Sequence, residues 1–541
     1  MDRRSLLMWL SSGAVAAAAD VSLGQSQSGS APGADGKGAG PVAQTRAGKV
    51  RGYMNGPVCV FKGIPYAAST AGANRFAPPR PREPWSGVLD ATQLGDKCPQ
   101  NPTPWLMMEE AVSLSNEPQS EDCLHLNVWT TGLRDGKKRP VMLWLHGGGY
   151  SSGSGGNTRY EGSRLATRQD VVVVTINHRL NIFGHLFLGD LGGNDVADSG
   201  NVGILDIVAA LQWVRDNIAE FGGDPGNVTI FGESGGGGKV STLLAMPAAQ
   251  GLFHRAIIQS GTALRQATRE AATKSAKAVL AQLGIQPGDI GKLRSVPQAD
   301  LLAAINEMRP PPSFTPVVDG RSLPRHPFDP DAPQVSANVP LLVGSNETEV
   351  TFFPDTPLDP IDDATLRDRV KRYTRVDDGT ASMVIDLYRH TRPKISNEHL
   401  YQIIASDYWM TSEVATQAER KAALGNAPVY VYYFQWESPV RGGKLRAVHS
   451  VEIPFVFDNV ALAEPLVGNG PDLPALADAV SGAWTRFART GNPNGKGLPM
   501  WPAYSSDKRH VMIFDKTSRV ESDPRRQERL AIAAIKARQS A

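Results

Sequence analysis

The chain has 541 residues, of which 41% are hydrophobic and 20% are charged, and its formal net charge at pH 7 is +2. This balance is typical of a globular protein, and the small net charge excludes partners that are recognised mainly by opposite charge, nucleic acids above all. The length allows either two domains or one large α/β domain with a long sheet.

The first residues predict export. Arg3 and Arg4 precede an apolar stretch of about fifteen residues that ends in alanines, the pattern of a signal peptide and too short to cross a bilayer. We therefore expect an export signal over residues 1–19 and no membrane span later in the chain. The arginine pair fits a twin-arginine signal, and an ordinary secretory signal fits equally well. Both predict a bacterial protein that is periplasmic or secreted.

Residues 20–44 are rich in Ser, Gly, Gln and Ala. Such a segment cannot bury enough apolar surface to fold, so we expect a disordered tether. From residue 45 to 541 no second linker, internal repeat or long charge run interrupts the chain, which favours one catalytic domain. Near the end, Arg525, Arg526 and Arg529 accompany Leu530 and Ile532 in a helical pattern, which predicts a terminal helix with a solvated basic face.

Short apolar runs alternate with helical patterns through the middle of the chain. The runs are VMLWL at 141–145, VVVVTI at 171–176, VTIF at 228–231, AIIQ, PLLVG and VYVYYF. Between the second and third runs, apolar residues recur at helical spacing from Ile204 to Ile218 and stop before Gly222. Strand, helix, strand is the rhythm of a doubly wound α/β fold with a large, mostly parallel twisted sheet flanked by helices.

The loop after the first run, His146 to Tyr150, reads HGGGY. Successive glycines leave the backbone N–H groups unobstructed. We therefore predict that Gly148 and Gly149 can stabilise a developing oxyanion.

The segment FGESGGGGKVS, from Phe231 to Ser241, admits two interpretations. A phosphate-binding loop requires a glycine and a hydroxyl residue where this chain has Glu233 and Val240. A carboxylate there would repel phosphate and valine cannot ligate magnesium, so this interpretation fails. The alternative, G-x-S-x-G between a strand and a helix, is a nucleophile elbow. It makes Ser234 the predicted nucleophile and the amide of Gly235 a third oxyanion donor.

Two glycines exceed the elbow motif, and a lysine follows them. Gly237 and Gly238 should each weaken the helix by about 1 kcal/mol relative to alanine. A first turn without side chains would let the helix pack closely against the oxyanion loop. It would also leave room beside the nucleophile for a large acyl group. We therefore expect Gly235→Ala to be tolerated with some loss on bulky acyl chains, and Gly236→Val to prevent folding. Lys239 has no predicted role.

Two later loops supply a candidate acid and base. PLLVGSNETEV places Glu347 and Glu349 after a strand, at the edge where open parallel sheets carry active sites, and the pattern does not separate them. The other histidines downstream lie in helical segments or at the start of a short strand. His449, in RAVHSVEIPF, instead follows VYVYYF and a turn, where a base can reach inward.

Taken together, these segments resemble the type-B carboxylesterases, the α/β-hydrolase family that includes the cholinesterases. The resemblance runs from about residue 48 to 515 and is most specific in FGGDPGNVTIFGESGG, around Ser234, and SEDCLHLNVW, around Cys123. It implies Glu349 as the acid, His449 as the base and a single catalytic domain with cap-like insertions. Gly235 departs from the family, which often has alanine there.

The resemblance also implies a disulfide between Cys98 and Cys123, whose loop would cover the pocket. The third cysteine, Cys59, lies in a strand-like run and is expected to be a buried free thiol. Possible pocket residues are Trp105, Tyr150 and Glu233.

The predicted reaction is hydrolysis of a bulky, largely apolar ester through an acyl-enzyme. Aryl, xenobiotic and natural-product esters all fit, including a role in detoxification. An amidase or carbamate hydrolase with the same triad, or a non-catalytic binding module of this fold, are the alternatives. We expect a small-molecule substrate, no cofactor and no metal. The oligomeric state is not predicted.

Overall fold

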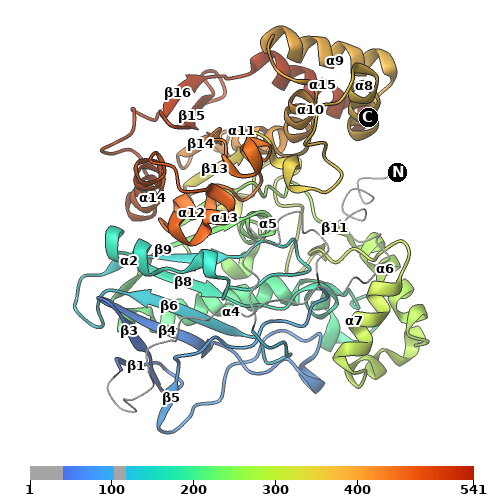
Figure 1. Ribbon diagram of the computed structural model, residues 1–541. Helices are drawn as coiled ribbons and strands as arrows, with labels where there is room; N and C mark the ends of the chain where they lie inside the picture. The colour runs from blue at the N-terminus through green and yellow to red at the C-terminus, as the bar shows by residue number, and fades with distance from the viewer. Residues whose placement is uncertain (1–39, 103–116, 541) are drawn as a thin grey trace, which may run out of the picture.

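The computed structural model describes residues 40–102 and 117–540 (Figure 1). Its main sheet has 11 strands. In chain order these are β3 (Tyr53–Asn55), β4 (Val58–Pro65), β6 (His125–Thr130), β7 (Arg139–Leu145), β8 (Val172–Ile176), β9 (Gly223–Glu233), β10 (Arg255–Gln259), β13 (Leu341–Asn346), β14 (Val429–Phe434), β15 (His510–Phe514) and β16 (Arg519–Ser522).

The strands lie in the order β16-β15-β14-β13-β10-β9-β7-β8-β6-β4-β3. Neighbours from β15 to β8 run parallel, and the strands at both edges are antiparallel. The parallel strands β7, β8, β13 and β14 are buried along their whole length, because helices cover both faces. The predicted α/β fold is therefore confirmed, and all six apolar runs form neighbouring strands.

Helices pack against both faces of the sheet. One face carries α4 (Val202–Asn217), α5 (Gly235–Leu243) and α11 (Ser412–Ala422), and α6 (Arg269–Gln282) extends the same apolar core away from the sheet. The other carries α2 (Ser163–Gln169), α12 (Ile453–Val456) and α14 (Leu473–Thr490). The helix predicted from Ile204 to Ile218 is α4 followed by a 3-10 turn, and Gly222 ends that turn with a positive φ of 74°. The chain then enters β9, and the candidate nucleophile Ser234 directly follows its last residue.

Four further helices gather at one end of the molecule, where they form a core of their own (Figure 1). They are α8 (Asp363–Thr374), α9 (Asp378–Thr391), α10 (Asn397–Ser406) and α15 (Arg526–Ser540). Ile532 is buried there, and Leu530 is exposed, as expected for a terminal helix. The basic face is only partly solvated, however. Arg525, just before α15, is largely shielded from solvent between two carboxylates, because its guanidinium reaches the end of β13. The other α-helices of the described residues are α3 (Asn181–His185), α7 (Gln298–Glu307) and α13 (Glu464–Val467).

A small sheet of β1 (Val42–Gln44), β2 (Lys49–Arg51) and β5 (Val88–Asp90) lies outside the main sheet, and β11 (Ala267–Thr268) pairs with β12 (Val317–Val318). The tether predicted over residues 20–44 is therefore wrong at its end. Residues 42–44 pair with β2 and bury Ala43 completely. The predicted export signal and residues 20–39 lie outside the described residues.

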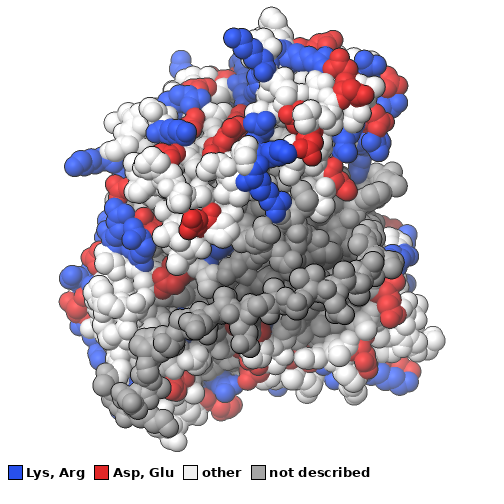
Figure 2. Space-filling model, in the orientation of Figure 1, with Lys and Arg blue, Asp and Glu red and all other residues white. Residues whose placement is uncertain are grey.

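The described surface has mixed charge. On the face shown in Figure 2, basic and acidic side chains are interspersed over the elements that the structure describes, in keeping with the formal net charge of +2. In residues 40–102 and 117–540, no helix has the length and apolarity of a membrane span.

Candidate active site

Ser234 is the single residue between β9 and α5, and its backbone has a conformation that serine rarely adopts. Its φ is 56° and its ψ is −123°. Its N–H donates to the carbonyl oxygen of Gln259 in β10 at 2.9 Å, which anchors the turn to the neighbouring strand. Strained backbone of this kind is stable only when the surroundings enforce it, and it is characteristic of a nucleophile elbow.

The glycines of the elbow are required by close backbone contacts. A Cβ added to Gly232 would lie 2.6 Å from a backbone carbon of Gly236, and one added to Gly236 would lie 1.9 Å from the carbonyl oxygen of Leu145. At Gly235 the added Cβ would lie 2.1 Å from the carbonyl oxygen of Gly149. At contacts this short the backbone on one side must shift. The geometry therefore opposes the expectation that Gly235→Ala is tolerated with a loss confined to bulky acyl chains.

The two extra glycines also have packing partners. A Cβ at Gly237 would lie 2.9 Å from the Cα of Gly261, and a Cβ at Gly238 would lie 2.7 Å from the hydroxyl of Tyr150. The space beside these two glycines is filled by a neighbouring loop and an aromatic ring. They serve the docking of α5 rather than opening room for an acyl group.

The loop after β7 lies beside Ser234. A Cβ added to Gly147 would lie 3.4 Å from the Cβ of Ser234. Gly148 and Gly149 have positive φ values of 84° and 61°, which favour glycine. Neither of their N–H groups donates a hydrogen bond to another described residue. The N–H of Gly235, in the first turn of α5, has no intrahelical acceptor either. These are the donors that an oxyanion hole needs.

The structure brings Glu349 and His449 together from two loops. Glu349 begins a 3-10 helix (Glu349–Phe352) just after β13, and its Oε2 lies 2.6 Å from Nδ1 of His449. Its Oε1 accepts the N–H of Asn346 at 2.7 Å, which fixes the carboxylate. Both side chains are buried. The pair has the geometry of an acid that orients a catalytic imidazole.

The other nitrogen of His449 faces a second carboxylate. Its Nε2 lies 3.1 Å from Oε1 of Glu233, which also accepts the hydroxyl of Ser450 at 2.6 Å. No hydrogen bond joins His449 to Ser234 in this arrangement of the described residues. Burial disfavours the imidazolium, but the carboxylates of Glu233 and Glu349 together raise the pKa of His449 to about 9. The carboxylate of Glu233, a predicted pocket residue, is thus buried and lies against Nε2 of His449.

A third carboxylate, Glu452, lies behind the histidine and was not predicted. It accepts hydrogen bonds from Asn346 at 2.7 Å and from Gln259 at 3.0 Å. Burial and the charge of Glu233 raise the pKa of Glu452 to about 7. We call Glu233, Glu349, His449 and Glu452 the catalytic cluster. A glutamate three residues after the candidate base, in a segment that turns inward, was the available signal.

Aromatic side chains cover the imidazole. The ring of Phe352 lies 5.3 Å and that of Trp409 lies 5.5 Å from the ring of His449, between centroids. Trp409 belongs to a π-helical turn (Asp407–Thr411), a local irregularity that is common at functional sites. Tyr150, a predicted pocket residue, packs against α5, and its hydroxyl accepts a hydrogen bond from Gln266 at 2.8 Å. Trp105 lies outside the described residues.

The predicted disulfide is not formed in the structure, which has Cys98 and Cys123 as buried free thiols. Sulfur of Cys98 accepts the N–H of Leu180 at 3.2 Å. Hydrogen bonding to the Cys98 thiol, together with burial, raises the pKa of Cys123. The two thiols are therefore neighbours in the core without a covalent bridge between them. Cys59 is a buried free thiol, as expected.

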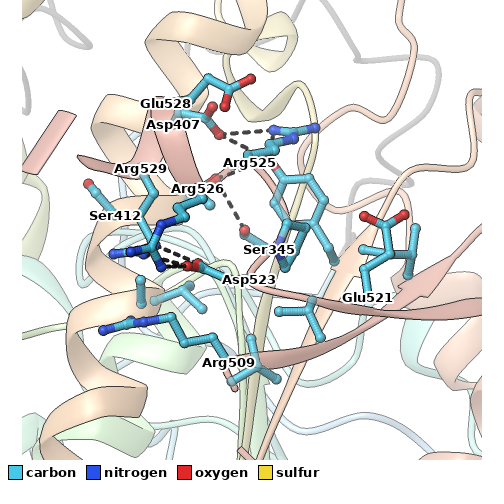
Figure 3. A pocket seen from close by; sticks show the side chains of 18 of the residues that line it. Ser345, Asp407, Ser412, Arg509, Glu521, Asp523, Arg525, Arg526, Glu528 and Arg529 are labelled. Carbon is cyan, nitrogen blue, oxygen red and sulfur yellow. Dashed lines mark hydrogen bonds and ion pairs between the residues drawn. The ribbon is translucent and has the colours of Figure 1, made fainter. Parts of the chain in front are cut away.

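Glu347, the alternative acid, belongs to a different cluster. It forms an ion pair with Arg525, whose guanidinium also meets Asp407 and the hydroxyl of Tyr433. We call Glu347, Asp407, Tyr433 and Arg525 the arginine cluster. It lines a cavity of about 590 Å³ between α11, α15 and the β14–β15 edge of the sheet. Figure 3 shows Arg525 against Asp407 and Asp523 between Arg526 and Arg529. Their charges are already paired, which sets this cavity apart from the catalytic cluster.

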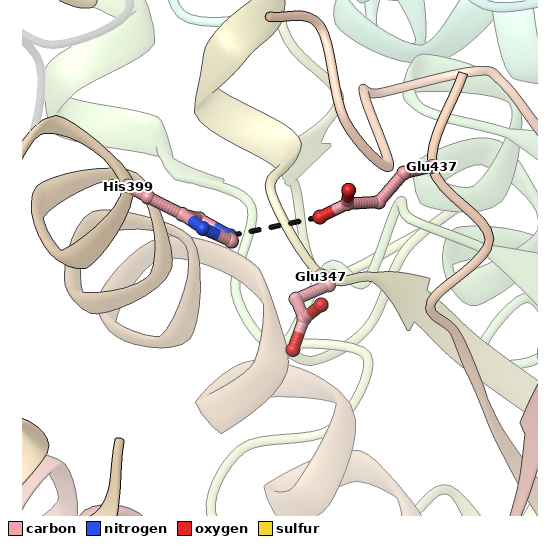
Figure 4. A group of neighbouring side chains, drawn as sticks. All are labelled: Glu347, His399 and Glu437. Atoms are coloured by element: carbon pink, nitrogen blue, oxygen red, sulfur yellow. Dashed lines mark ion pairs between the residues drawn. The ribbon is translucent and has the colours of Figure 1, made fainter. Parts of the chain in front are cut away.

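One group of potential metal ligands occurs among the described residues: Glu347, His399 and Glu437 (Figure 4). Nε2 of His399 lies 3.9 Å from Glu437. Burial and nearby arginines lower the pKa of His399 to about 3, and arginines already pair with both glutamates. This positive environment disfavours a cation.

Known proteins match this chain over most of its length. The profile of the Carboxylesterase family matches residues 39–532. The chain is 38% identical over 498 residues to para-nitrobenzyl esterase of Bacillus subtilis, covering 90% of this chain and 97% of that protein. It is 34% identical over 511 residues to phenmedipham hydrolase of Pseudarthrobacter oxydans, covering 92% and 99%. A solved carboxylesterase of Geobacillus stearothermophilus aligns with a TM-score of 0.79 at 42% identity, covering 91% of this chain and 99% of that chain.

Proposed function

This chain belongs to the carboxylesterase family and is a carboxylic ester hydrolase, and from this premise we propose that Ser234 is its nucleophile. His449 takes the proton from Oγ of Ser234 as that oxygen attacks the ester carbonyl. Glu349 orients the imidazole through Nδ1 and stabilises the imidazolium. His449 then protonates the leaving alcohol, and water repeats the cycle to release the acid.

The observation that carries this proposal is the 2.6 Å contact between His449 and Glu349, beside a strained serine at the end of a parallel strand. The amides of Gly148, Gly149 and Gly235 are the proposed oxyanion donors. Removing one such donor typically slows an acyl transfer by about a hundred- to thousandfold.

We further propose that the resting enzyme is switched on by loss of a proton. As an imidazolium, His449 is held between Glu233 and Glu349 and cannot accept a proton from Ser234. When the imidazolium loses its proton, Nε2 is released from Glu233 and is free to act as the base. Activity should therefore rise as the pH rises through the pKa of His449.

The proposed substrate is bulky and largely apolar. The aromatic rings of Phe352 and Trp409 beside His449 support this choice, because they offer a flat apolar surface next to the reacting carbonyl. Aryl esters suit this surface. A role in detoxification follows only if such esters are foreign to the cell that makes the enzyme.

Ser234→Ala tests the nucleophile. The variant should fold as the wild type does, lose turnover and no longer react with a fluorophosphonate, which labels the wild-type serine stoichiometrically. Mass spectrometry of the labelled peptide identifies the modified residue. Full activity of the purified variant, or a label on another residue, would contradict the assignment.

Carbamate hydrolysis is a second candidate reaction. Phenmedipham, the compound named for one relative, is a carbamate. The same serine, histidine and glutamate would serve both reactions. Rates on an aryl ester and on an aryl carbamate with the same leaving group separate the two, and a higher kcat/KM on the carbamate would favour this candidate.

Export is proposed from the first 19 residues. Fusion of these residues to a reporter that is active only outside the bacterial cytoplasm tests the signal. Replacing Arg3 and Arg4 by lysine tests the twin-arginine route, because only that route depends on the arginine pair.

A further inference from the structure

Lys239, the residue after the glycine run, is completely buried in α5. Its Nζ donates one hydrogen bond, to the carbonyl oxygen of His146 at 2.8 Å. It forms no ion pair within residues 40–102 and 117–540. Burial of an ammonium group without a counter-charge is unfavourable, and burial lowers the pKa of Lys239 to about 7.

The surroundings of Lys239 are neutral. Three buried histidines, His146, His178 and His185, face it, and burial lowers the pKa of each of them. The rings of His146 and His178 stack at 4.9 Å between centroids. The ring centroid of Tyr150 lies 5.9 Å from Nζ. A lysine in such a place stabilises the fold little, so its hydrogen bond is its main contribution.

That hydrogen bond ends at the base of the oxyanion loop. His146 is the last residue with a side chain before Gly147, Gly148 and Gly149, and glycines offer no side chain by which to hold a loop. On the far side of the loop, the N–H of Asn181 donates to the carbonyl oxygen of Tyr150 at 2.7 Å. The glycine segment is thus fastened at both ends, and the anchor from α5 is Lys239.

We propose that Lys239 is a positioning residue that holds the oxyanion loop against α5 so that its amides meet the transition state. This inference rests on the proposed function, because it presupposes that the loop supplies oxyanion donors. Both the ammonium and the neutral amine donate hydrogen bonds, so the anchor persists on either side of the pKa of Lys239.

The glycine run explains how the lysine reaches the loop. Gly235 and Gly236 let the first turn of α5 touch Gly149 and Leu145, and Gly238 leaves room for Tyr150. Bulkier residues at these positions would push the loop away from the helix. The lysine one turn further on then reaches the carbonyl oxygen behind the loop.

Lys239→Met tests the inference, since methionine fills similar space without an N–H donor. We expect kcat to fall at least about tenfold with little change in KM, because the oxyanion forms after substrate binding. Affinity for a trifluoromethyl ketone should fall by a similar factor. Oγ of Ser234 adds to the carbonyl carbon of this inhibitor, the proton moves to His449, and the former carbonyl oxygen becomes an oxyanion.

Lys421 in α11 provides the matched control. It is also buried, it donates to the carbonyl oxygens of Ser336 and Ala337, and burial lowers its pKa to about 8. It lies at neither the catalytic cluster nor the oxyanion loop. Lys421→Met should therefore leave kcat and ketone affinity within about twofold of wild type, whatever it does to stability.

A folded Lys239→Met enzyme with wild-type kcat and ketone affinity overturns the inference, as does an equal loss of both in Lys421→Met. If Lys239→Met does not fold, Lys239→Leu replaces it in the same measurements. Ser234→Ala separates this result from the proposed function. If Ser234→Ala retains turnover, the proposed nucleophile is wrong. If it is inactive while Lys239→Met behaves as wild type, only the role of Lys239 fails.

Discussion

Glu347 and Glu349 leave the same strand end two residues apart and enter two opposite environments. Glu347 pairs with Arg525 in the arginine cluster, where a largely shielded positive charge balances the carboxylates. Glu349 enters the catalytic cluster, where three carboxylates surround one imidazole and form no ion pair with a described lysine or arginine. The carboxylate is the same in both, and its counter-charge decides whether it stabilises the fold or tunes a base.

The difference begins in the backbone. Residues two apart on a strand share a face of the sheet, but β13 ends at Asn346 and a 3-10 helix begins at Glu349. The turn between them sends the two side chains to different partners. The excess of negative charge around His449 then raises its pKa, whereas the paired charges around Arg525 do not require a proton to balance them.

A pair of matched substitutions should separate the roles of the two clusters most clearly. Glu349→Gln should lower kcat by about a thousand- to ten-thousandfold with little loss of stability, because the imidazole loses the acid that orients it. Glu347→Gln should keep kcat within about threefold, yet lower the free energy of unfolding by about 2 kcal/mol, because Arg525 is left with one carboxylate. Ester turnover and urea unfolding measure the two effects. A reversed pattern would exchange the roles assigned to the two clusters.

Gly235→Ala tests how tightly the oxyanion loop packs against the first turn of α5. The new methyl group would meet the carbonyl oxygen of Gly149, so the loop must move and kcat should fall by about a hundredfold. Gly288→Ala, where an added Cβ meets no atom within 4 Å, is the control. Equal turnover in both variants would show that the loop adapts without losing its donors.

Glu233→Gln tests whether the carboxylate charge of Glu233 raises the pKa of His449. In the wild type the base is neutral only as the pH rises through the pKa of His449, about 9, so kcat/KM should climb toward that pH. Removing the charge of Glu233 lowers that pKa and moves the rise to lower pH. Glu347→Gln removes the same charge from the arginine cluster and should leave the profile in place. A profile that does not move in Glu233→Gln would show that the charge of Glu233 does not raise the pKa of His449.

Trp409→Ala should have the smallest effect. Loss of the aromatic ring beside His449 should reduce kcat/KM on aryl esters by about tenfold and on small aliphatic esters by less than about threefold. Paired rates on the two classes measure this selectivity. Equal losses on both would indicate that Trp409 supports the imidazole and does not contact substrate.

Much of the fold was predictable because apolar runs and helical spacing are local properties of the chain. All six runs became strands of the main sheet, and the pattern from Ile204 to Ile218 became α4 with its 3-10 turn. The elbow around Ser234 was predictable for a similar reason, since strand, glycine and serine adjoin one another. The end of the tether was missed, because β1 exists only through pairing with β2.

The sequence by itself determined the strand order along the chain, the type of nucleophile and the chemistry of its candidate partners, because these depend on residues near one another. The residue pattern left Glu347 and Glu349 open, and the family resemblance alone favoured Glu349. The tertiary structure brings Glu349 to His449 and adds Glu452 behind it. It also pairs Arg525 with two carboxylates, leaves Cys98 and Cys123 unbridged, and brings Lys239 to the oxyanion loop. These outcomes depend on contacts between segments up to hundreds of residues apart, and the charge or space at such a contact is set by the partner.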